Sequence, residues 1–411
     1  MKIKDFVSDA QVVKQITRLN QKFVRKKVKV SDILDAQGHQ YVDLVMEGGG
    51  VLGIALVGYT YALEKAGIRF LGVGGTSAGA INALLVAGVG RPNEAKSEKI
   101  LGILAALDMF SFVDGDDDAE DFCRAMVNKA GKLRLMLKGW QVIDNLTERL
   151  GLNPGKTFLE WLTSQLKKYG VTTLAELEQQ MKPPSLHTRD GDAISARKAG
   201  AKLALVAADI STETKVVFPE MAPLYWRKYK QVNPACFVRA SMSIPAFFEP
   251  YRIKEIPQGL EAARLWDKHA GYDGHLPEEV VFVDGGIMSN FPITLFHSDE
   301  APPLAPTFGV KLGVERMRPR EVESFGSLLG GVFDAARHCA DYDFLIQNPD
   351  YEHLVTFIRT GEHNWLDFFM KDDAKVDLFR RGVEAGVEFL LGFDWGDYKD
   401  LRVRLKNSPR S

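Results

Sequence analysis

Three short polar motifs follow apolar, strand-like runs, and their residue types suit attack on a carbonyl group. The first is Gly75-Thr76-Ser77-Ala78-Gly79, a G-x-S-x-G pentapeptide between an apolar run and a helical pattern. A serine on a tight strand-to-helix turn is exposed as a nucleophile, because the glycines permit a strained backbone and a close helix–strand approach. The alternative is a serine that caps the helix, since serine is a favoured N-cap residue. The pentapeptide by itself leaves both interpretations open.

The second motif is the glycine-rich run Glu47-Gly48-Gly49-Gly50-Val51-Leu52-Gly53. Its G-x-G-x-x-G spacing matches the dinucleotide-binding fingerprint, which also requires an acidic residue at the end of the next strand. The next strand ends instead in Gly74-Gly75-Thr76, which disfavours a dinucleotide site. The remaining interpretation is a loop of backbone N–H groups, which can form an oxyanion hole beside the serine.

The third motif, Asp284-Gly285-Gly286, supplies a carboxylate that can act as a general base. It follows the apolar run 280–283, and its glycines let another backbone come close. An aspartate can take the serine proton when it lies within hydrogen-bond reach and its surroundings raise its pKa. The alternative is a turn aspartate bonded to its own backbone, which is common in Asp-Gly pairs. Asp209, after the run 203–208, is the second candidate, as a base or as a supporting carboxylate.

Histidine is the commonest general base in enzymes, but no histidine here lies in a recognisable motif. Most lie in polar stretches, which indicates exposure. The eight are His39, His187, His269, His275, His297, His338, His353 and His363. Asp284 is therefore the preferred base.

The motifs lie in a pattern of short apolar runs that alternate with helical stretches. This pattern predicts an α/β fold with a largely parallel central sheet covered by helices on both faces. In such a sheet, residues just past the strand ends share one crevice, where ligands bind. We therefore expect the glycine run, Ser77 and Asp284 to meet there.

Composition excludes several other classes of protein. The 411 residues carry a formal net charge of −2, so no global field points to nucleic acid. Cys123, Cys236 and Cys339 have no C-x-x-C spacing, which argues against a disulfide framework and a zinc site. The N-terminus lacks the apolar core of a signal peptide, and no run approaches a membrane span. We expect a cytoplasmic protein.

The chain divides into a basic N-terminal segment (1–40), a catalytic core (41–300) and a C-terminal part (301–411). The C-terminal part contains a strand-like run at 354–360 and a helical pattern at 373–392, which we expect to complete the same domain. The polar stretch 182–200, broken by proline and glycine, predicts a mobile loop.

Residues 1–30 carry nine Lys and Arg against two Asp, a local charge of +7. Val13, Ile16, Leu19 and Phe23 recur at helical spacing, with cations on the other side. A basic amphipathic helix can lie on an anionic bilayer, so peripheral membrane contact is one expectation. The more common fate of an amphipathic helix is to pack on its own domain with its charged face in solvent.

Two further stretches allow more than one interpretation. Asn364–Met370, NWLDFFM, is core or an acyl-chain contact, and core is favoured because large apolar residues usually face inward. The acidic stretch 114–121 resembles the start of a calcium loop, but Ala119 and Ala125 stand where an EF-hand needs glycine and glutamate. A solvated acidic loop is the better interpretation.

The set EGGGVLG, GTSAG and DGG, in this order, resembles the patatin-like phospholipase family, and the resemblance extends from about residue 41 to about residue 390. The stretches VAADISTETKVVF, ASMSIPAFFEP and SNFPI agree with it. It implies a patatin-like three-layer α/β/α fold and a lipid acyl hydrolase that acts on lipid or phospholipid through a Ser-Asp dyad, without a cofactor or a catalytic metal.

The resemblance also implies a role for each motif residue. Ser77 takes the position of the nucleophile and Asp284 that of the base. The family's oxyanion loop, elbow glycines and DGG glycines correspond to Gly48, Gly49, Gly50 and Gly53, to Gly75 and Gly79, and to Gly285 and Gly286. The chain departs from the usual pattern at Leu52, where many members carry Arg or Lys, and at Glu47, where Asp is usual. An acyltransferase that uses the same serine, and a catalytically silent lipid-binding protein, remain alternatives.

Overall fold

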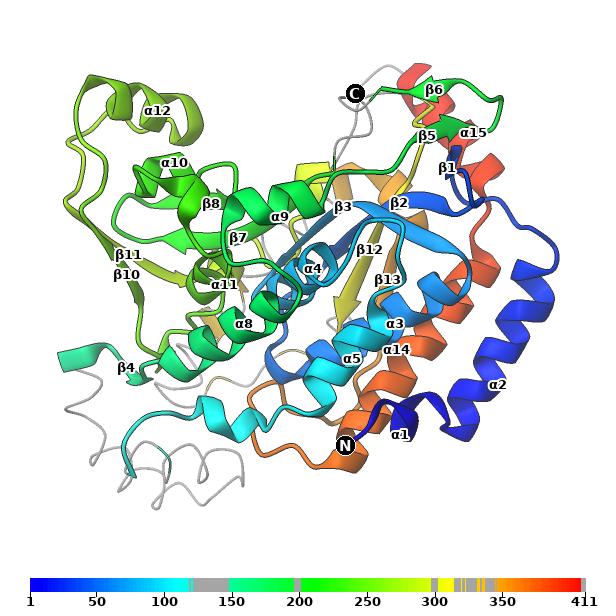
Figure 1. Ribbon diagram of the computed structural model, residues 1–411, viewed down its shortest axis with the longest axis horizontal. Helices are drawn as coiled ribbons and strands as arrows, with labels where there is room; N and C mark the ends of the chain where they lie inside the picture. The colour runs from blue at the N-terminus through cyan, green and yellow to red at the C-terminus, as the bar shows by residue number, and fades with distance from the viewer. Residues whose placement is uncertain are drawn as a thin grey trace.

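The computed structural model describes residues 1–117, 120, 148–195, 201–296, 302–313, 348–407 and isolated positions between 319 and 347. Of the residues discussed above, Ala119, Cys123, Ala125, His297, His338 and Cys339 lie outside this set. Figure 1 shows the described elements as a twisted sheet with helices packed around it.

The main sheet is mixed, with parallel strands at its centre. β13, β12, β2, β3 and β7 lie side by side in this order and run parallel to one another. Antiparallel strands pair with this group: β8 and β11 pair with β7, β10 pairs with β11, and β1, β5 and β6 follow one another from β2. The strands are β1 (Ile33–Asp35), β2 (Gln40–Met46), β3 (Ile68–Thr76), β5 (Leu186–Thr188), β6 (Ala193–Ile194), β7 (Leu203–Asp209), β8 (Thr214–Phe218), β10 (Tyr251–Lys254), β11 (Glu279–Asp284), β12 (Thr307–Leu312) and β13 (Val355–Ile358), with β4 (Gly151–Asn153) and β9 (Ala246–Phe248) paired separately.

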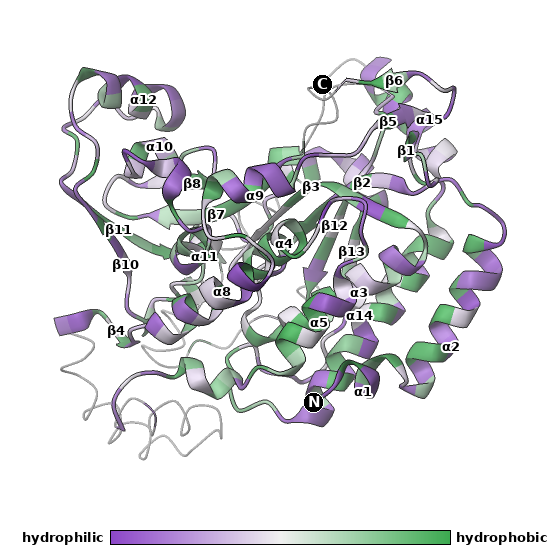
Figure 2. Cartoon of the chain, viewed as in Figure 1, coloured by the Kyte–Doolittle hydropathy of each residue, from purple (hydrophilic) through white to green (hydrophobic). Residues whose placement is uncertain are grey.

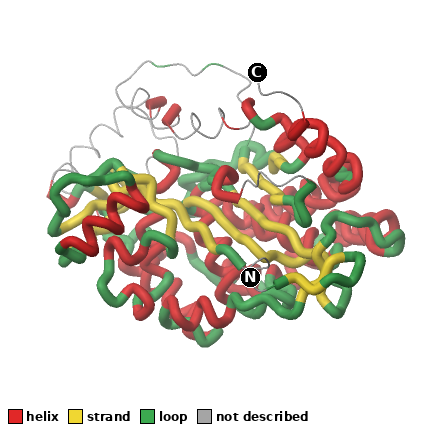
Figure 3. Tube along the Cα trace, turned by 90° about the horizontal axis from the view of Figure 1, so that it is seen from above, coloured by secondary structure: helices red, strands yellow, loops and turns green. Residues whose placement is uncertain are grey.

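Helices cover the sheet and position the loops at its carboxyl edge. They are α1 (Ile3–Val7), α2 (Ala10–Leu19), α3 (Gly53–Lys65), α4 (Ala78–Gly88), α5 (Ser97–Ala105), α8 (Lys156–Lys168), α9 (Leu174–Gln180), α10 (Ala222–Tyr225), α11 (Ala235–Ser241), α12 (Leu260–Ala270), α14 (Asp372–Gly392) and α15 (Trp395–Asn407). Viewed from above in Figure 3, the strands form one layer with helices packed against it. The mixed sheet flanked by helices agrees with the three-layer α/β/α arrangement expected from the sequence.

Apolar residues concentrate on the central strands and on α4 (Figure 2), which explains why these elements form the core. α3 and α14 approach so closely that a Cβ at Gly58 would overlap the Phe379 carbonyl. A Cβ at Gly382 would likewise overlap the Ala55 carbonyl. Small residues let two helix backbones come together here. Residues 301–411 thus contribute β12 and β13 to the sheet and α14 to its helical cover.

The N-terminal segment is packed on the domain. Phe6, Val12, Leu19 and Phe23 are buried, and the ring of Phe6 meets that of Phe379 edge-on at 5.6 Å. The predicted apolar stripe is confirmed at Leu19 and Phe23, which are buried, and at Ile16, which packs against the core; it is wrong at Val13, which is 49% exposed while Val12 is buried. The apolar face of α2 therefore packs against α14, with Lys14 exposed and Arg18 paired with Glu388 of α14.

Part of the predicted mobile loop at 182–200 is ordered structure. Residues 186–188 and 193–194 form the hairpin β5–β6, which pairs with β1, while residues 196–200 lie outside the described set. The Pro and Gly residues that suggested a loop lie in the flanks and the turn of this hairpin.

Candidate active site

Ser77 lies on a strained turn between β3 and α4. Its backbone has φ 52° and ψ −118°, a conformation that costs a non-glycine residue about 1–3 kcal/mol and persists only where surrounding structure holds it. The Ser77 side chain makes no capping hydrogen bond to α4, so the helix-capping interpretation is wrong. Both neighbouring glycines are needed, because a Cβ at Gly79 would overlap the Met46 carbonyl and one at Gly75 would lie 2.6 Å from the Gly79 oxygen.

Asp284 lies at the end of β11, a strand that runs in the direction opposite to β3. We expected β11 to follow the parallel pattern, but β11 runs antiparallel to β7. β3 pairs with Leu203–Val206 of β7, and β11 pairs with Ala207–Asp209, while β8 takes the other edge of β7. The two strands therefore share one edge of β7 and meet end to end, with Thr76 opposite Val206 and Asp284 opposite Ala207. One step along a strand is about 3.3 Å, so this register brings the elbow and Asp284 together.

The end of α11 holds both residues through hydrogen bonds. Ser241 Oγ accepts the Ser77 N–H at 2.9 Å and donates to the Val206 carbonyl at 2.6 Å. Two residues later, the Ser243 carbonyl accepts the Asp284 N–H at 2.8 Å. The Asp284 carboxylate accepts the Gly286 N–H at 2.8 Å, which orients it as in an Asp-Gly turn. The stretch ASMSIP, assigned no role from sequence, thus positions the nucleophile turn and the carboxylate.

The glycine run lies directly against Ser77. A Cβ at Gly48 would lie 3.3 Å from the Ser77 Cβ and would overlap the Asn290 side chain, so only glycine fits. Asn290 makes two hydrogen bonds to Gly48. Its main-chain carbonyl accepts the Gly48 N–H at 3.0 Å, and its Nδ2 donates to the Gly48 carbonyl at 3.3 Å. Thr76 Oγ1 donates to the Ser289 carbonyl at 2.8 Å. The stretch SNFPI therefore ties the glycine run to the elbow.

The rest of the glycine run presents main-chain donors. Gly50 has φ +54°, and the Val51 N–H donates to the Trp365 carbonyl at 3.0 Å. Within the part of the chain that is described, no hydrogen bond engages the N–H of Gly49 or Gly50. At the end of the run, Asn82 Nδ2 donates to the Gly53 and Ala78 carbonyls at 3.2 and 3.0 Å, which links the loop to α4.

Glu47 anchors the start of the run, although the sequence suggested no role for it. Its Oε2 accepts the Leu312 N–H at 2.6 Å, and its Oε1 lies 3.2 Å from Lys311 Nζ. Both side chains are nearly buried, and breaking such a pair leaves an uncompensated charge in the interior. Glu47 thereby fixes the loop to the end of β12.

Ser77 opens into an apolar cavity of about 70 Å³. Its walls come from Ile54, Ile81, Leu104, Leu107, Met109, Phe112, Phe158, Trp161, Met242, Ile244, Phe248 and Phe368, together with Gly50, Val51, Gly53, Ala78 and Asn82. No charged residue and no histidine appears among these described lining residues. The cavity therefore suits a hydrocarbon group attached to the carbonyl that Ser77 would attack.

Comparison with known proteins identifies the family. The model of the patatin-like phospholipase family matches residues 44–297, which is more than half of the chain. The chain belongs to the patatin-like phospholipase family. At this level it is a lipid hydrolase, and the serine, carboxylate and glycine run lie within the matched residues.

The chain is also similar to individual proteins and solved structures. It is 28% identical over 352 residues to the uncharacterized protein YqhO of Bacillus subtilis (strain 168), covering 85% of this chain and 98% of YqhO. The crystal structure of VipD from Legionella pneumophila superposes with a TM-score of 0.41 at 15% identity, over 88% of this chain and 70% of VipD. A chain in the complex of SpcU with ExoU, from the type III secretion system of Pseudomonas aeruginosa, gives a TM-score of 0.36 at 16% identity, over 85% and 52%.

The other candidate residues of this patatin-like chain have structural partners. Asp209 accepts the Ser211 N–H at 2.8 Å, the Thr212 hydroxyl at 2.9 Å and the Tyr225 hydroxyl at 3.2 Å, and burial raises its pKa. Asp209 thus stabilises the turn between β7 and β8.

His363 and Asp114 also have partners away from Ser77. His363 Nε2 lies 2.9 Å from Asp377. Asp114 accepts the N–H groups at the start of α8, at 2.9 and 3.0 Å, so this part of the acidic stretch caps a helix.

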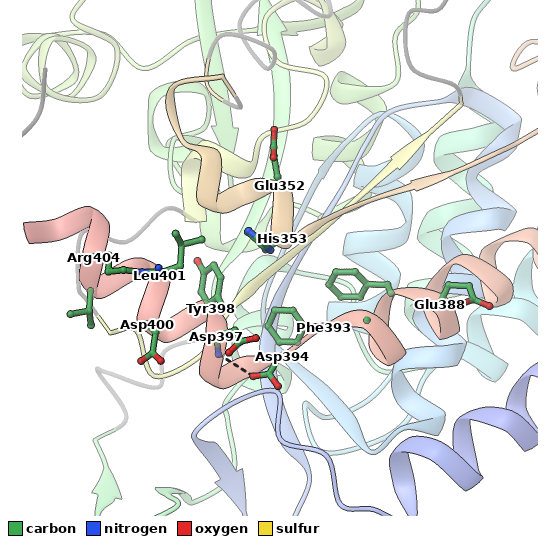
Figure 4. Close-up of a pocket in the computed structure, with 13 residues that line it drawn as sticks. Glu352, His353, Glu388, Phe393, Asp394, Asp397, Tyr398, Asp400, Leu401 and Arg404 are labelled. Carbon is green, nitrogen blue, oxygen red and sulfur yellow. Dashed lines mark hydrogen bonds between the residues drawn. The ribbon is translucent and has the colours of Figure 1, made fainter. Parts of the chain in front are cut away.

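A larger groove of about 940 Å³ lies at the junction of α14 and α15, away from Ser77 (Figure 4). Its many carboxylates include Asp394, which accepts the Asp397 N–H at 3.0 Å, and Glu388, which pairs with Arg18. Asp394 caps the start of α15, and Glu388 links α14 to α2. We therefore assign the chemistry to the smaller cavity, which contains the strained serine.

No helix in the described ranges is both long and apolar enough to cross a bilayer.

Proposed function

We propose that this patatin-like protein hydrolyses fatty acyl esters of lipids, with Ser77 as the nucleophile and Asp284 as its general base. The observation that carries the proposal is the strained Ser77 turn, whose hydroxyl does not cap α4. Ser77 lines an apolar cavity, and the sheet register sets the end of β11 beside its turn. A strained residue in a cleft beside a carboxylate is typical of a reactive site.

The reaction balances with these groups. Ser77 Oγ attacks the ester carbonyl carbon while Asp284 takes its proton, and the carbonyl oxygen becomes an oxyanion. As the tetrahedral intermediate collapses, the alcohol leaves with the proton from Asp284 and an acyl-enzyme remains. Water then attacks the acyl carbon, again giving its proton to Asp284, and the Ser77 oxygen leaves and recovers a proton.

Main-chain donors support the oxyanion in this scheme. The Gly49 and Gly50 N–H groups have no acceptor among the described residues, and Gly50 lines the cavity with Ser77. Donors that are already oriented stabilise the developing charge without reorganisation, and one such donor contributes about 3 kcal/mol. The dipole of α4, which begins at Ala78, adds to this field.

A serine-directed fluorophosphonate probe and a soluble p-nitrophenyl ester test the proposal. Ser77→Ala should lose both labelling and hydrolysis while its circular dichroism stays unchanged. Ser8→Ala, at an exposed serine far along the chain, should retain both. Hydrolysis that persists in Ser77→Ala would refute the assignment. Acyl transfer to an added alcohol would favour the acyltransferase alternative. Labelling of Ser77 without ester turnover would favour the catalytically silent lipid-binding protein.

We further propose that the N-terminal segment contacts anionic membranes through charge alone. Lys22, Lys26 and Lys27 are exposed, whereas the apolar face of this segment is buried and cannot insert. Each cation near an anionic surface contributes about 1 kcal/mol. Changing all three to Glu should weaken sedimentation with phosphatidylserine vesicles and spare ester hydrolysis. The same change at exposed Lys167 and Lys168 is the control, and equal binding by both variants would rule the contact out.

A further inference from the structure

Residues 364–370, here called the aromatic segment, lie outside the residues matched by the family model yet form part of the Ser77 cavity. The segment connects β13 to α14. Its Trp365 carbonyl accepts the Val51 N–H at 3.0 Å, which fixes the segment to the glycine run. A Cβ at Gly50 would overlap this carbonyl, so the two backbones are in close contact. Phe368 is buried and lines the cavity together with Ser77.

The ring of Phe368 is held in one place by its neighbours. It stacks on Phe247 with centroids 4.6 Å apart and an interplanar angle of 14°, and it meets Phe248 edge-on at 6.2 Å. The next residue, Phe369, pairs instead with Phe110 at 4.8 Å and is not among the lining residues. Adjacent phenylalanines of the same segment thus lie on different sides, one on the cavity and one away from it.

The size of the cavity determines how much of an acyl chain can enter beside the Phe368 ring. At about 70 Å³ the cavity has little free space beside the Phe368 ring, so we expect the ring to hinder a long acyl chain. Each additional methylene that enters an apolar pocket raises binding about fourfold. Removing the ring should therefore favour long chains selectively, because short chains already fit.

We propose that Phe368 limits the length of the acyl chain that this site accepts. The inference rests on the proposed function, because it concerns the acyl group delivered to Ser77. It assigns a selective role to a segment that the family's matched region does not include.

The test compares kcat/KM for p-nitrophenyl acetate, butyrate and octanoate. Phe368→Ala should raise the octanoate-to-acetate ratio at least tenfold over the wild-type protein. Phe369→Ala should leave the ratio within twofold. Phe368→Leu keeps the site apolar and serves if the alanine variant fails to fold; it should raise the ratio severalfold.

The outcomes separate this inference from the proposed function. Ser77-dependent hydrolysis with an unchanged ratio in a folded Phe368 variant overturns the inference alone. An equal shift in Phe369→Ala does the same, because the effect would then not belong to the cavity wall. Absence of Ser77-dependent hydrolysis of even the acetate ester overturns both.

Discussion

Ser241→Ala removes a single hydroxyl that links the nucleophile turn to the central sheet. That hydroxyl accepts the Ser77 N–H at 2.9 Å and donates to the Val206 carbonyl at 2.6 Å, and Ser241 is completely buried. Two main-chain groups would lose their partners, each at a cost of about 1–3 kcal/mol. We expect the free energy of unfolding to fall by about 2–6 kcal/mol.

Turnover should suffer as well, because the strained Ser77 backbone loses a constraint. A displacement of about 1 Å in a reacting group can lower the rate about 100-fold, so we expect kcat to fall 10- to 100-fold with KM nearly unchanged. The matched control is Ser97→Ala, which removes a buried hydroxyl bonded to Glu64 at 2.5 Å, away from the site.

The assays are urea unfolding and steady-state hydrolysis of a soluble ester. Ser97→Ala should lose stability and keep its kcat under conditions where it is folded. If both variants lose stability and neither loses kcat, the Ser241 bond is structural only, and our account of how the turn is held is wrong.

Three further changes test other parts of the structure. Asp284→Asn should lower kcat by orders of magnitude, whereas Asp209→Asn should chiefly alter stability; the reverse result in ester hydrolysis would exchange their roles. Burial raises the pKa of Asp43 from 3.8 to about 6, so its carboxylate destabilises the fold increasingly as the pH rises from 4 to 6. Asp43→Asn should therefore gain up to about 3 kcal/mol over wild type above pH 6 and nothing below pH 4, measured by urea unfolding; a difference independent of pH would refute this. Gly79→Ala should abolish folding or activity through its clash with the Met46 carbonyl, whereas Gly392→Ala, with open space around it, should be tolerated in melting and activity assays.

The sequence by itself determined the local elements and the identity of the motifs. α3 ends at Lys65, just before Gly67 at φ +81°, because apolar periodicity and a glycine stop act over a few residues and can be read from the sequence. The strand and helix predicted near 354–360 and 373–392 are β13 and α14 for the same reason. The motif set also led to the family that comparison then identified.

Tertiary structure alone decided how the distant parts meet. Nothing in the apolar run 280–283 specifies that β11 runs antiparallel and ends beside the elbow, because strand direction depends on pairing with a segment far along the chain. Ser241 and Asn290 reach Ser77 and Gly48 from 164 and 242 residues away, and Phe368 reaches the cavity from beyond the matched region. Serines, asparagines and aromatics are common in any chain, so their types carry no signal of position. Only the packing of the folded chain, where backbone groups and rings must find partners, assigns them to this site.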